Sequence, residues 1–414
     1  MNDPVDIAVL GSGPAALAVA GALRSRDASV LLVAPEPRAS WKPMYAMWRD
    51  EVPRSLEHAV ERCWEGTSVR TPQGTHPVGR AYAKLDTARY QASLWGGLDD
   101  GDVEVVADRV VAVDETPIGA DVRTASGAQR SARVVVDASG AETPFVERVH
   151  ARPPAYQMAY GLLLDARGHG FDRRQAVLMD FVPADPEAPD PASFLYALPL
   201  DGDRLFLEET SLARRPAMAM TDLAARLELR LATHGLEQAT RVAEEHCRIP
   251  MGLGLPKPKQ RVVPFGAAAA MVHPASGYLQ AHIHRKAPVV ADAILLGLRA
   301  GGGHDATARA NEAVWSTAER KAWELYAVGL ESLVSMSAAQ MGGFFHGFFS
   351  LPMASWSGYL AGTLAPPALR TVMNEVFRTL PLRLRWQLLR SSVTKGAAPL
   401  ARSLVPRTQD EPIS

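Results

Sequence analysis

Asp6-Ile7-Ala8-Val9-Leu10-Gly11-Ser12-Gly13-Pro14-Ala15-Ala16 carries an apolar run directly into a glycine turn. The apolar run predicts a buried strand, the residues from Pro14 through Leu23 predict an apolar helix, and residues 29–33 predict a second strand. Gly11 permits a tight turn, and Gly13 lets the backbone approach a pyrophosphate at the positive end of the helix. Ala16 stands where the third glycine is usual, which is an accepted variant. This order of elements predicts a Rossmann-like fold that binds a dinucleotide.

Two further segments bear on the identity of the dinucleotide. The second strand ends at Ala34, where an acid normally contacts the ribose, so Glu36 is the candidate for that contact. A later apolar strand, 133–137, runs into Asp137-Ala138-Ser139-Gly140. Such a strand often lies near the cofactor in FAD proteins, although an ordinary buried strand and turn would read the same way. Asp137 and Gly140 are therefore predicted to bind the cofactor, and FAD is favoured over NAD.

Composition excludes several classes of protein. The chain has 414 residues and a formal net charge of −1, so no global basic character suggests nucleic acid. Its two cysteines, Cys63 and Cys247, indicate a reducing compartment rather than a disulfide framework. The first residues are acidic where a signal peptide would be basic, and no apolar run approaches the roughly 18 residues of a membrane span. We expect a cytoplasmic protein that is soluble or held at a membrane surface.

A carboxylate doublet lies in the middle of the chain, in Phe206-Leu207-Glu208-Glu209-Thr210-Ser211-Leu212. The preceding turn, 201–203, lies between apolar segments and predicts a hairpin. Side chains alternate between the faces of a strand, so one of Glu208 and Glu209 should face the interior. Glu208 is favoured because it shares a face with Phe206. A carboxylic acid in an apolar pocket holds a proton that it can donate, whereas two solvated acids on a surface strand are the alternative.

Several segments resemble, in the same order, those of the lycopene cyclase family of FAD proteins, the plant and bacterial β/ε-cyclase type. The first segment is Trp41–Glu51, in which Met44 and Ala46 replace the family's Asn and Gly. The run 206–212 matches the family's acidic motif in full. The other matching segments are 82–86, 157–161, 179–180, 194–199, 249–252, 255–256, 260–261 and 265–278. The resemblance covers residues 5–290 and continues more weakly through 344–360.

The resemblance implies an α/β fold: a glutathione-reductase-type, Rossmann-like FAD-binding domain with an inserted sheet-rich substrate domain and a helical C-terminal part. We place the FAD-binding domain at 1–150 and 251–300, with 41–100 contributing to the substrate side. The substrate-binding sheet domain is placed at 151–250, and the helical region at 301–414, with one long helix over 306–340.

The resemblance also implies a function. The family's members close a ring at the linear end of a polyprenyl or carotenoid chain, most simply lycopene, without net redox change. Their FAD acts in its reduced form, and NAD(P)H is the expected reductant. A cyclase of another terpenoid, a flavin-dependent prenyl reductase and a monooxygenase remain as alternatives.

The candidate site residues fall into three groups. Glu208 and Glu209 are the catalytic candidates. The small-residue run after the strand at 262–265 is expected to lie over the flavin and adds Gly266, His273, Pro274 and Gly277 to the cofactor-binding set. Aromatic side chains, which stabilise cations, are the candidates for binding substrate: Trp41, Tyr45, Trp48, Tyr160, Tyr196, Phe344, Phe345 and Phe348.

Two observations concern other partners. Basic and apolar residues alternate over 370–407, which suits a helix on an anionic membrane surface; a solvated basic face on a core helix is the alternative. His282 and His284 have the spacing of a metal-binding pair, but no third ligand is close in sequence, so we expect no metal.

Overall fold

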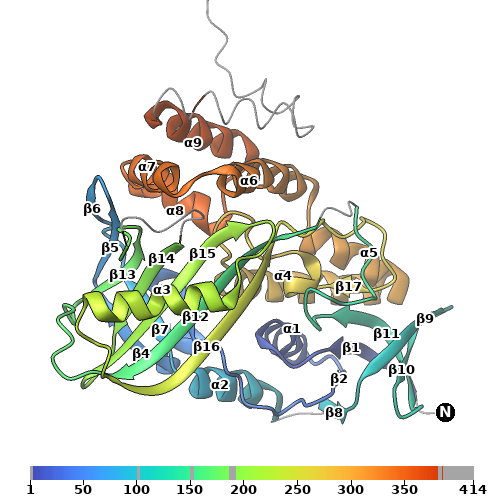
Figure 1. The fold of residues 1–414 in the computed structure, drawn as a ribbon. Helices are drawn as coiled ribbons and strands as arrows, with labels where there is room; N and C mark the ends of the chain where they lie inside the picture. The colour runs from blue at the N-terminus through green and yellow to red at the C-terminus, as the bar shows by residue number, and fades with distance from the viewer. Residues whose placement is uncertain (1–2, 100–102, 150–152, 186–192, 381–384, 386–414) are drawn as a thin grey trace, which may run out of the picture.

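The computed structural model describes residues 3–99, 103–149, 153–185, 193–380 and 385. Figure 1 shows two large sheets side by side, with a group of C-terminal helices above the second one. The first sheet runs in the order β8-β2-β1-β11-β10-β9, and β17 also pairs with β11. Its strands are β1 (Val5–Leu10), β2 (Val30–Ala34), β8 (Val103–Ala107), β9 (Val110–Thr116), β10 (Gly119–Thr124), β11 (Gln129–Asp137) and β17 (Val263–Pro264).

The first sheet is the predicted dinucleotide fold. Strands β8, β2, β1, β11 and β17 are parallel, whereas β9 and β10 are antiparallel to their neighbours. Ile7 and Val9 belong to a core cluster with helices on one face, while Ala8 and Leu10 belong to a cluster on the other face. Fully burying one aliphatic side chain stabilises the folded state by about 1.5–3 kcal/mol. The apolar run of β1 gains this stabilisation for every side chain only because both faces of the sheet are covered. The helices beside this sheet are α1 (Pro14–Arg24), α2 (Thr87–Asp99), α4 (Gln280–Ala300) and α5 (Gly303–Val314).

The second sheet runs in the order β16-β12-β15-β14-β13-β5-β6. Neighbouring strands within this sheet are antiparallel, except for β13 and β5, which are parallel. Its strands are β5 (Gly66–Thr71), β6 (Gly74–Pro77), β12 (Ala155–Asp165), β13 (Gln175–Asp180), β14 (Ser193–Pro199), β15 (Arg204–Arg214) and β16 (Thr240–Met251). Helix α3 (Met220–Thr233) packs on one face through Leu223, Leu227 and Leu231. The opposite face meets the C-terminal helices.

A small third sheet runs in the order β3-β7-β4. Its strands are β3 (Tyr45–Trp48), β4 (Val60–Trp64) and β7 (Tyr82–Leu85), and two short 3-10 helices, η1 (Arg49–Glu51) and η2 (Arg54–Ala59), join β3 to β4.

The predicted single helix over 306–340 is wrong, because the chain forms three helices in this region: α5, α6 (Thr317–Ser335) and α7 (Ala338–Phe349). Ser316 and Ser337 begin new helices by capping boxes, in which the serine side chain accepts a hydrogen bond from a backbone N–H of the first turn. Each cap is worth about 0.5–2 kcal/mol, enough to favour a break where the chain can turn.

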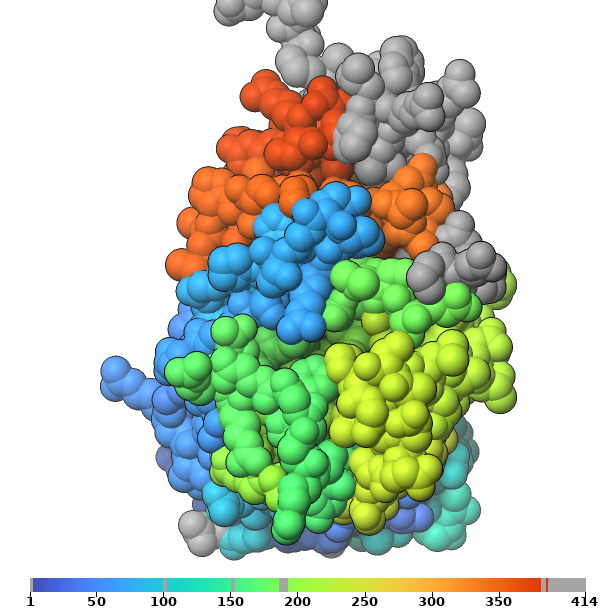
Figure 2. All heavy atoms as spheres, turned by 60° about the vertical axis from the view of Figure 1, so that its left-hand side comes forward, coloured from blue at the N-terminus to red at the C-terminus, as the bar shows by residue number. Residues whose placement is uncertain are grey.

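Two more helices complete the described C-terminal part, α8 (Met353–Ala361) and α9 (Pro366–Thr379). Figure 2 shows the β5–β6 segment, in blue, lying against orange atoms of the C-terminal helices, and β5 and β6 contact α7. His76 on β6 contacts His346 on α7 at 2.7 Å between ring nitrogens. Among the described residues, no helix is both long and apolar enough to cross a membrane. Most of the basic segment predicted to meet a membrane, 381–384 and 386–407, lies outside the described residues.

Candidate active site

The glycine turn between β1 and α1 opens onto a cavity of about 760 Å³. Gly11 has a φ of +107°, and a Cβ atom there would lie 2.7 Å from the carbonyl oxygen of Ala138, so this position requires glycine. A Cβ atom at Gly13 would meet nothing within 4 Å. Gly13 therefore has open space in front of the helix N-terminus, where a pyrophosphate binds in this fold. The volume lies within the roughly 300–1,000 Å³ of pockets that enclose a small molecule.

The other predicted cofactor residues take different places. Gly140 lines this cavity, as do Ala267 and Leu279, which precede α4, and Gln280, the first residue of α4. Asp137 is fully buried and accepts hydrogen bonds from the Ser139 backbone N–H and side-chain hydroxyl, at 3.0 and 2.6 Å. It therefore shapes the turn that carries Gly140.

Three more of them lie at the rim of the cavity or away from it. Ala16 is fully buried in the core beneath the turn. Glu36 is exposed after β2 and is not among the residues that line the cavity. Gly266 packs against the start of α1, where a Cβ atom would lie 2.5 Å from that of Ala15.

Residues around Gly277 line two further cavities. Gly277 lines a cavity of about 230 Å³ below the second sheet. His273 and Pro274 line another of about 410 Å³, between α4, α6 and α8. His273 is buried against the ring of Tyr326, with 4.4 Å between centroids, and burial lowers its pKa to about 3. A neutral histidine that packs on an aromatic ring is thus part of the wall behind the loop.

Glu208 lies on β15 with its side chain in the 230 Å³ cavity. Its strand neighbours are Gly161 on β12 and Tyr196 on β14. The hydroxyl of Thr210, on the same face, donates a hydrogen bond of 2.7 Å to its carboxylate. Burial, followed by the charge of Glu245, raises the pKa of Glu208 to about 8. The side chain is partly accessible only because it opens on the cavity, so it behaves as a buried acid that is protonated at neutral pH.

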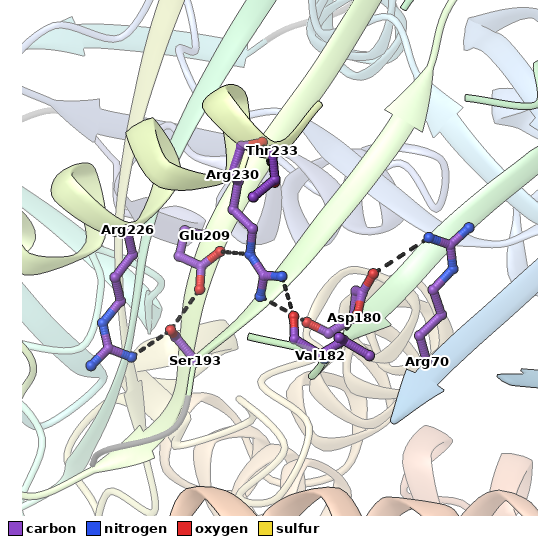
Figure 3. A network of polar contacts seen from close by, with 8 residues as sticks. All are labelled: Arg70, Asp180, Val182, Ser193, Glu209, Arg226, Arg230 and Thr233. Atoms are coloured by element: carbon purple, nitrogen blue, oxygen red, sulfur yellow. Dashed lines mark hydrogen bonds and ion pairs between the residues drawn. The ribbon is translucent and has the colours of Figure 1, made fainter. Parts of the chain in front are cut away.

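Glu209 lies on the opposite face, toward α3, and is 1% exposed. Arg230 of α3 donates a hydrogen bond of 3.1 Å from Nε to its carboxylate, and the hydroxyl of Ser193 donates another of 2.6 Å. Figure 3 shows Glu209 held between these two side chains. Arg230 also donates to the carbonyl oxygens of Val182 and Asp180. The second carboxylate of the doublet therefore ties a helix to the sheet and does not reach the cavity.

Two polar residues of the cavity were absent from the predicted set, Glu245 and Cys247 on β16. Glu245 accepts hydrogen bonds from the Met44 backbone N–H at 3.0 Å and from the Cys247 thiol at 3.2 Å. Burial raises the pKa of Glu245 and of Cys247. The only signal in the sequence was a second carboxylate doublet, Glu244-Glu245, just before the matching segment at 249–252.

Glu208, Glu245 and Cys247 bring one ligand atom each within 4.8 Å of one another, a spacing that could also hold a metal ion. The expectation of no metal stays a prediction.

The predicted substrate residues divide into three groups. Three of them line the cavity: Trp48, Tyr196 and Phe345. Phe344 and Phe348 pack against Phe345 within α7, at centroid distances of 5.3 and 6.2 Å. They support the wall without lining it.

Three aromatic candidates lie elsewhere. Trp41 and Tyr45 pack edge to face with Tyr90, and the Trp41 indole donates to the Ser12 carbonyl at 3.2 Å, beside the cofactor turn. Tyr160 faces the α3 side of the sheet and lies against His246. Its neighbour Gly161 occupies the cavity face, so alternation along β12 excludes Tyr160 from the cavity.

Comparison with known proteins shows which family this chain resembles in sequence. A family model described as lycopene cyclase protein matches residues 6–385. The chain is 36% identical over 395 residues to a lycopene beta cyclase of Synechococcus elongatus, covering 93% of this chain and 95% of that protein. It is 32% identical over 429 residues to the chloroplastic/chromoplastic lycopene beta cyclase of Capsicum annuum, covering 99% of this chain and 85% of that protein.

Solved structures confirm the predicted fold class. A geranylgeranyl bacteriochlorophyll reductase-like protein of Thermoplasma acidophilum superposes with a TM-score of 0.67 at 13% identity, over 97% of this chain and 99% of that one. A probable FAD-dependent monooxygenase of Pseudomonas aeruginosa superposes with a TM-score of 0.59 at 19% identity, over 82% of this chain and 99% of that one. The shared fold, the glycine turn and the 760 Å³ cavity together support a flavin cofactor. From its sequence over nearly its full length, the chain belongs to the lycopene cyclase family.

Proposed function

We propose that this protein is a flavin-dependent cyclase that closes a six-membered ring at the linear end of a carotenoid, most simply lycopene. The observation that carries the proposal is Glu208, an acid whose pKa is raised to about 8, in an apolar cavity of a chain from this family. Protonation of an alkene requires an acid that is neutral at working pH and shielded from water.

The residues around the cavity support the following reaction sequence. Glu208 donates its proton to the terminal double bond, a neighbouring double bond attacks the resulting cation, and loss of a proton to the carboxylate leaves the ring and restores the acid. The aromatic rings of Trp48, Tyr196 and Phe345 line the same space, and each desolvated ring face stabilises a cation by about 0.5–2 kcal/mol. Product and substrate have the same mass, which makes the reaction an isomerisation.

The size of the cavity limits how the substrate binds. Its volume of about 230 Å³ is below the roughly 300–1,000 Å³ that encloses a whole small ligand. We infer that one end group of a long chain enters and that the remainder extends outside this cavity.

The cofactor would be held by Gly11, Gly13 and Gly140 in the larger cavity. When bound and reduced, FAD supplies negative charge that stabilises a nearby carbocation. NAD(P)H is the proposed reductant.

Replacing Gly13 with Leu should abolish flavin binding without unfolding the protein. The added side chain enters open space, so it fills the volume of the pyrophosphate and leaves the core intact. The absorbance of bound flavin after purification or reconstitution measures the effect. Gly96→Leu is the matched control, because Gly96 is exposed on α2, also has open space around it, and does not line the cavity. Full flavin content in Gly13→Leu would contradict the placement of the cofactor.

Turnover should consume no reductant in proportion to product. Lycopene in detergent or vesicles is added to the protein after anaerobic reduction of its flavin by NAD(P)H, and cyclised product and NAD(P)H are both quantified. We expect product of unchanged mass, and reductant used only for the initial reduction. Reductant oxidised in step with product would assign a prenyl reductase or monooxygenase. Cyclisation of a shorter or mixed terpenoid but not of lycopene would assign a cyclase of another substrate class.

Attachment to a membrane surface is proposed because a long polyene dissolves in the bilayer. The described helix α9 buries its apolar residues Leu369, Val372 and Val376 in the helical part and exposes Arg370 and Arg378, so α9 itself is a core helix with a basic face. Attachment should therefore depend mainly on charge. Flotation with anionic vesicles should be strong at low salt and weaken at high salt, since surface attraction is screened. Equal binding to neutral vesicles in high salt would contradict this electrostatic attachment.

A further inference from the structure

Glu208 and Glu245 approach each other across a strand that has no side chain between them. Both residues pair with Gly161 of β12, Glu208 from β15 and Glu245 from β16. A Cβ atom at Gly161 would lie 2.7 Å from the ring of Phe206 and 3.5 Å from the Cβ of Glu208. The glycine therefore leaves the room that two carboxylates on alternate strands need in order to meet, within 4.8 Å, on the cavity face.

The surroundings of this pair are almost free of positive charge. Among the described residues, neither carboxylate forms an ion pair. Lys84 on β7, the cation that acts on Glu245, is paired with Glu61, and Arg80 is paired with Glu51. The other polar groups near the pair are neutral at pH 7: the Cys247 thiol, the Thr210 hydroxyl and the phenols of Tyr45, Tyr82, Tyr196 and Tyr278. Two carboxylates this close, without a cation, do not both ionise at neutral pH.

The hydrogen bonds around the pair distinguish its members. Glu245 accepts from the Met44 N–H and from the Cys247 thiol, and donors of this kind stabilise a carboxylate. Glu208 accepts one hydrogen bond, from Thr210. The negative charge is therefore better accommodated on Glu245, and the proton on Glu208.

We propose that Glu208 and Glu245 hold one proton between them, and that Glu245 is the positioning residue that keeps this proton on Glu208 at neutral pH. Only the expected effect of the shared proton on turnover rests on the proposed function. The proton content of the pair is a property of the protein alone. Glu245 acts through Glu208, by its charge and its distance, and contacts no reacting atom in this scheme.

The pH dependence of turnover tests the consequence. Glu208 works in its protonated form, so activity is present below its raised pKa and is lost as the pH rises through about 8. Glu245→Gln removes the neighbouring charge and lowers the pKa of Glu208. We expect the alkaline limb of the kcat profile of the FAD-loaded enzyme to move to lower pH by about one unit, a tenfold loss at fixed alkaline pH.

Two variants make the result specific. Glu244→Gln is the matched control, because Glu244 is the adjacent residue of β16, points to the other face and is half exposed. Glu244→Gln should leave the alkaline limb of the kcat profile at its original pH. Glu245→Asp keeps the charge and should return the limb close to its original position. An unshifted limb in Glu245→Gln would overturn the proposal, as would a Glu245→Asp profile that matches Glu245→Gln.

Infrared titration separates this proposal from the proposed function. The stretching band of a protonated carboxyl group in the FAD-loaded protein, identified by its loss in Glu208→Gln, should disappear with a midpoint near pH 8 and at lower pH in Glu245→Gln. Identical midpoints in the two proteins would refute the shared proton whether or not the enzyme cyclises lycopene. A shifted midpoint in a protein that cyclises no carotenoid would support the pair and refute the function.

Discussion

Glu208→Gln is expected to lower the rate of cyclisation by at least about 100-fold, the scale of lost general acid catalysis. The amide keeps the shape of the side chain and can accept the hydrogen bond of Thr210, but it has no acidic proton to give to an alkene. Flavin content and thermal stability should stay normal, because Glu208 forms no ion pair among the described residues and opens on a cavity. Single-turnover measurements with reduced flavin and lycopene give the rate of the chemical step.

The same chemical change at the neighbouring residue is the control. Glu209→Gln leaves the cavity unchanged, since Glu209 lies on the α3 face, and should reduce cyclisation much less than Glu208→Gln. Turnover in heavy water should place one deuteron on the carbon that is protonated first. The acid-initiated mechanism is wrong if Glu208→Gln cyclises at the original rate or if the product gains no deuterium.

Local patterns in the sequence were enough to predict part of this site. The glycine turn specifies its own geometry, because only glycine fits beside Ala138 at position 11. The period of two along a strand predicts that Glu208 and Glu209 point to opposite faces, and the structure shows this arrangement. Both inferences depend on residues that are adjacent in sequence, where covalent geometry determines direction.

The remaining features depend on pairing between distant segments. Glu245 meets Glu208 only because β12 lies between β15 and β16 in one particular register, and a shift of one residue would move Glu245 to the other face. The same register places Tyr160 toward α3, although its aromatic ring suggested a cavity residue. His273 was expected at the flavin, but the fold of its loop turns it toward Tyr326. No local pattern in the sequence indicates the register of distant strands or the direction in which a loop turns a side chain.

The doublet also shows how one short motif can serve two purposes. Burial, followed by the charge of Glu245, raises the pKa of Glu208, whereas the adjacent carboxylate has a dedicated arginine. The face of the sheet decides which environment each carboxylate meets. A variant that removes the arginine should therefore affect folding before it affects chemistry.

Arg230→Met is expected to destabilise the protein by about 3–5 kcal/mol, the cost of breaking a buried ion pair by removing one partner. The side chains of Arg230 and Glu209 are 8% and 2% exposed, so the remaining carboxylate would be buried without its counter-ion. The carbonyl oxygens of Val182 and Asp180 would lose their donor as well. Urea unfolding of the FAD-loaded protein, followed by circular dichroism, gives the change in free energy.

A second substitution on the same helix provides the comparison for Arg230→Met. Arg226 lies one turn earlier on α3 and donates to the hydroxyl of Ser193, but it is only half-buried and does not pair with Glu209 in Figure 3. Arg226→Met should destabilise the protein less than Arg230→Met, because it leaves the buried Glu209–Arg230 ion pair in place. The double variant Glu209→Leu with Arg230→Met should recover part of the lost stability, because it removes the unpaired charge. Equal destabilisation by the single and the double variant would show that the arginine stabilises the fold through packing and its carbonyl contacts, and not through Glu209.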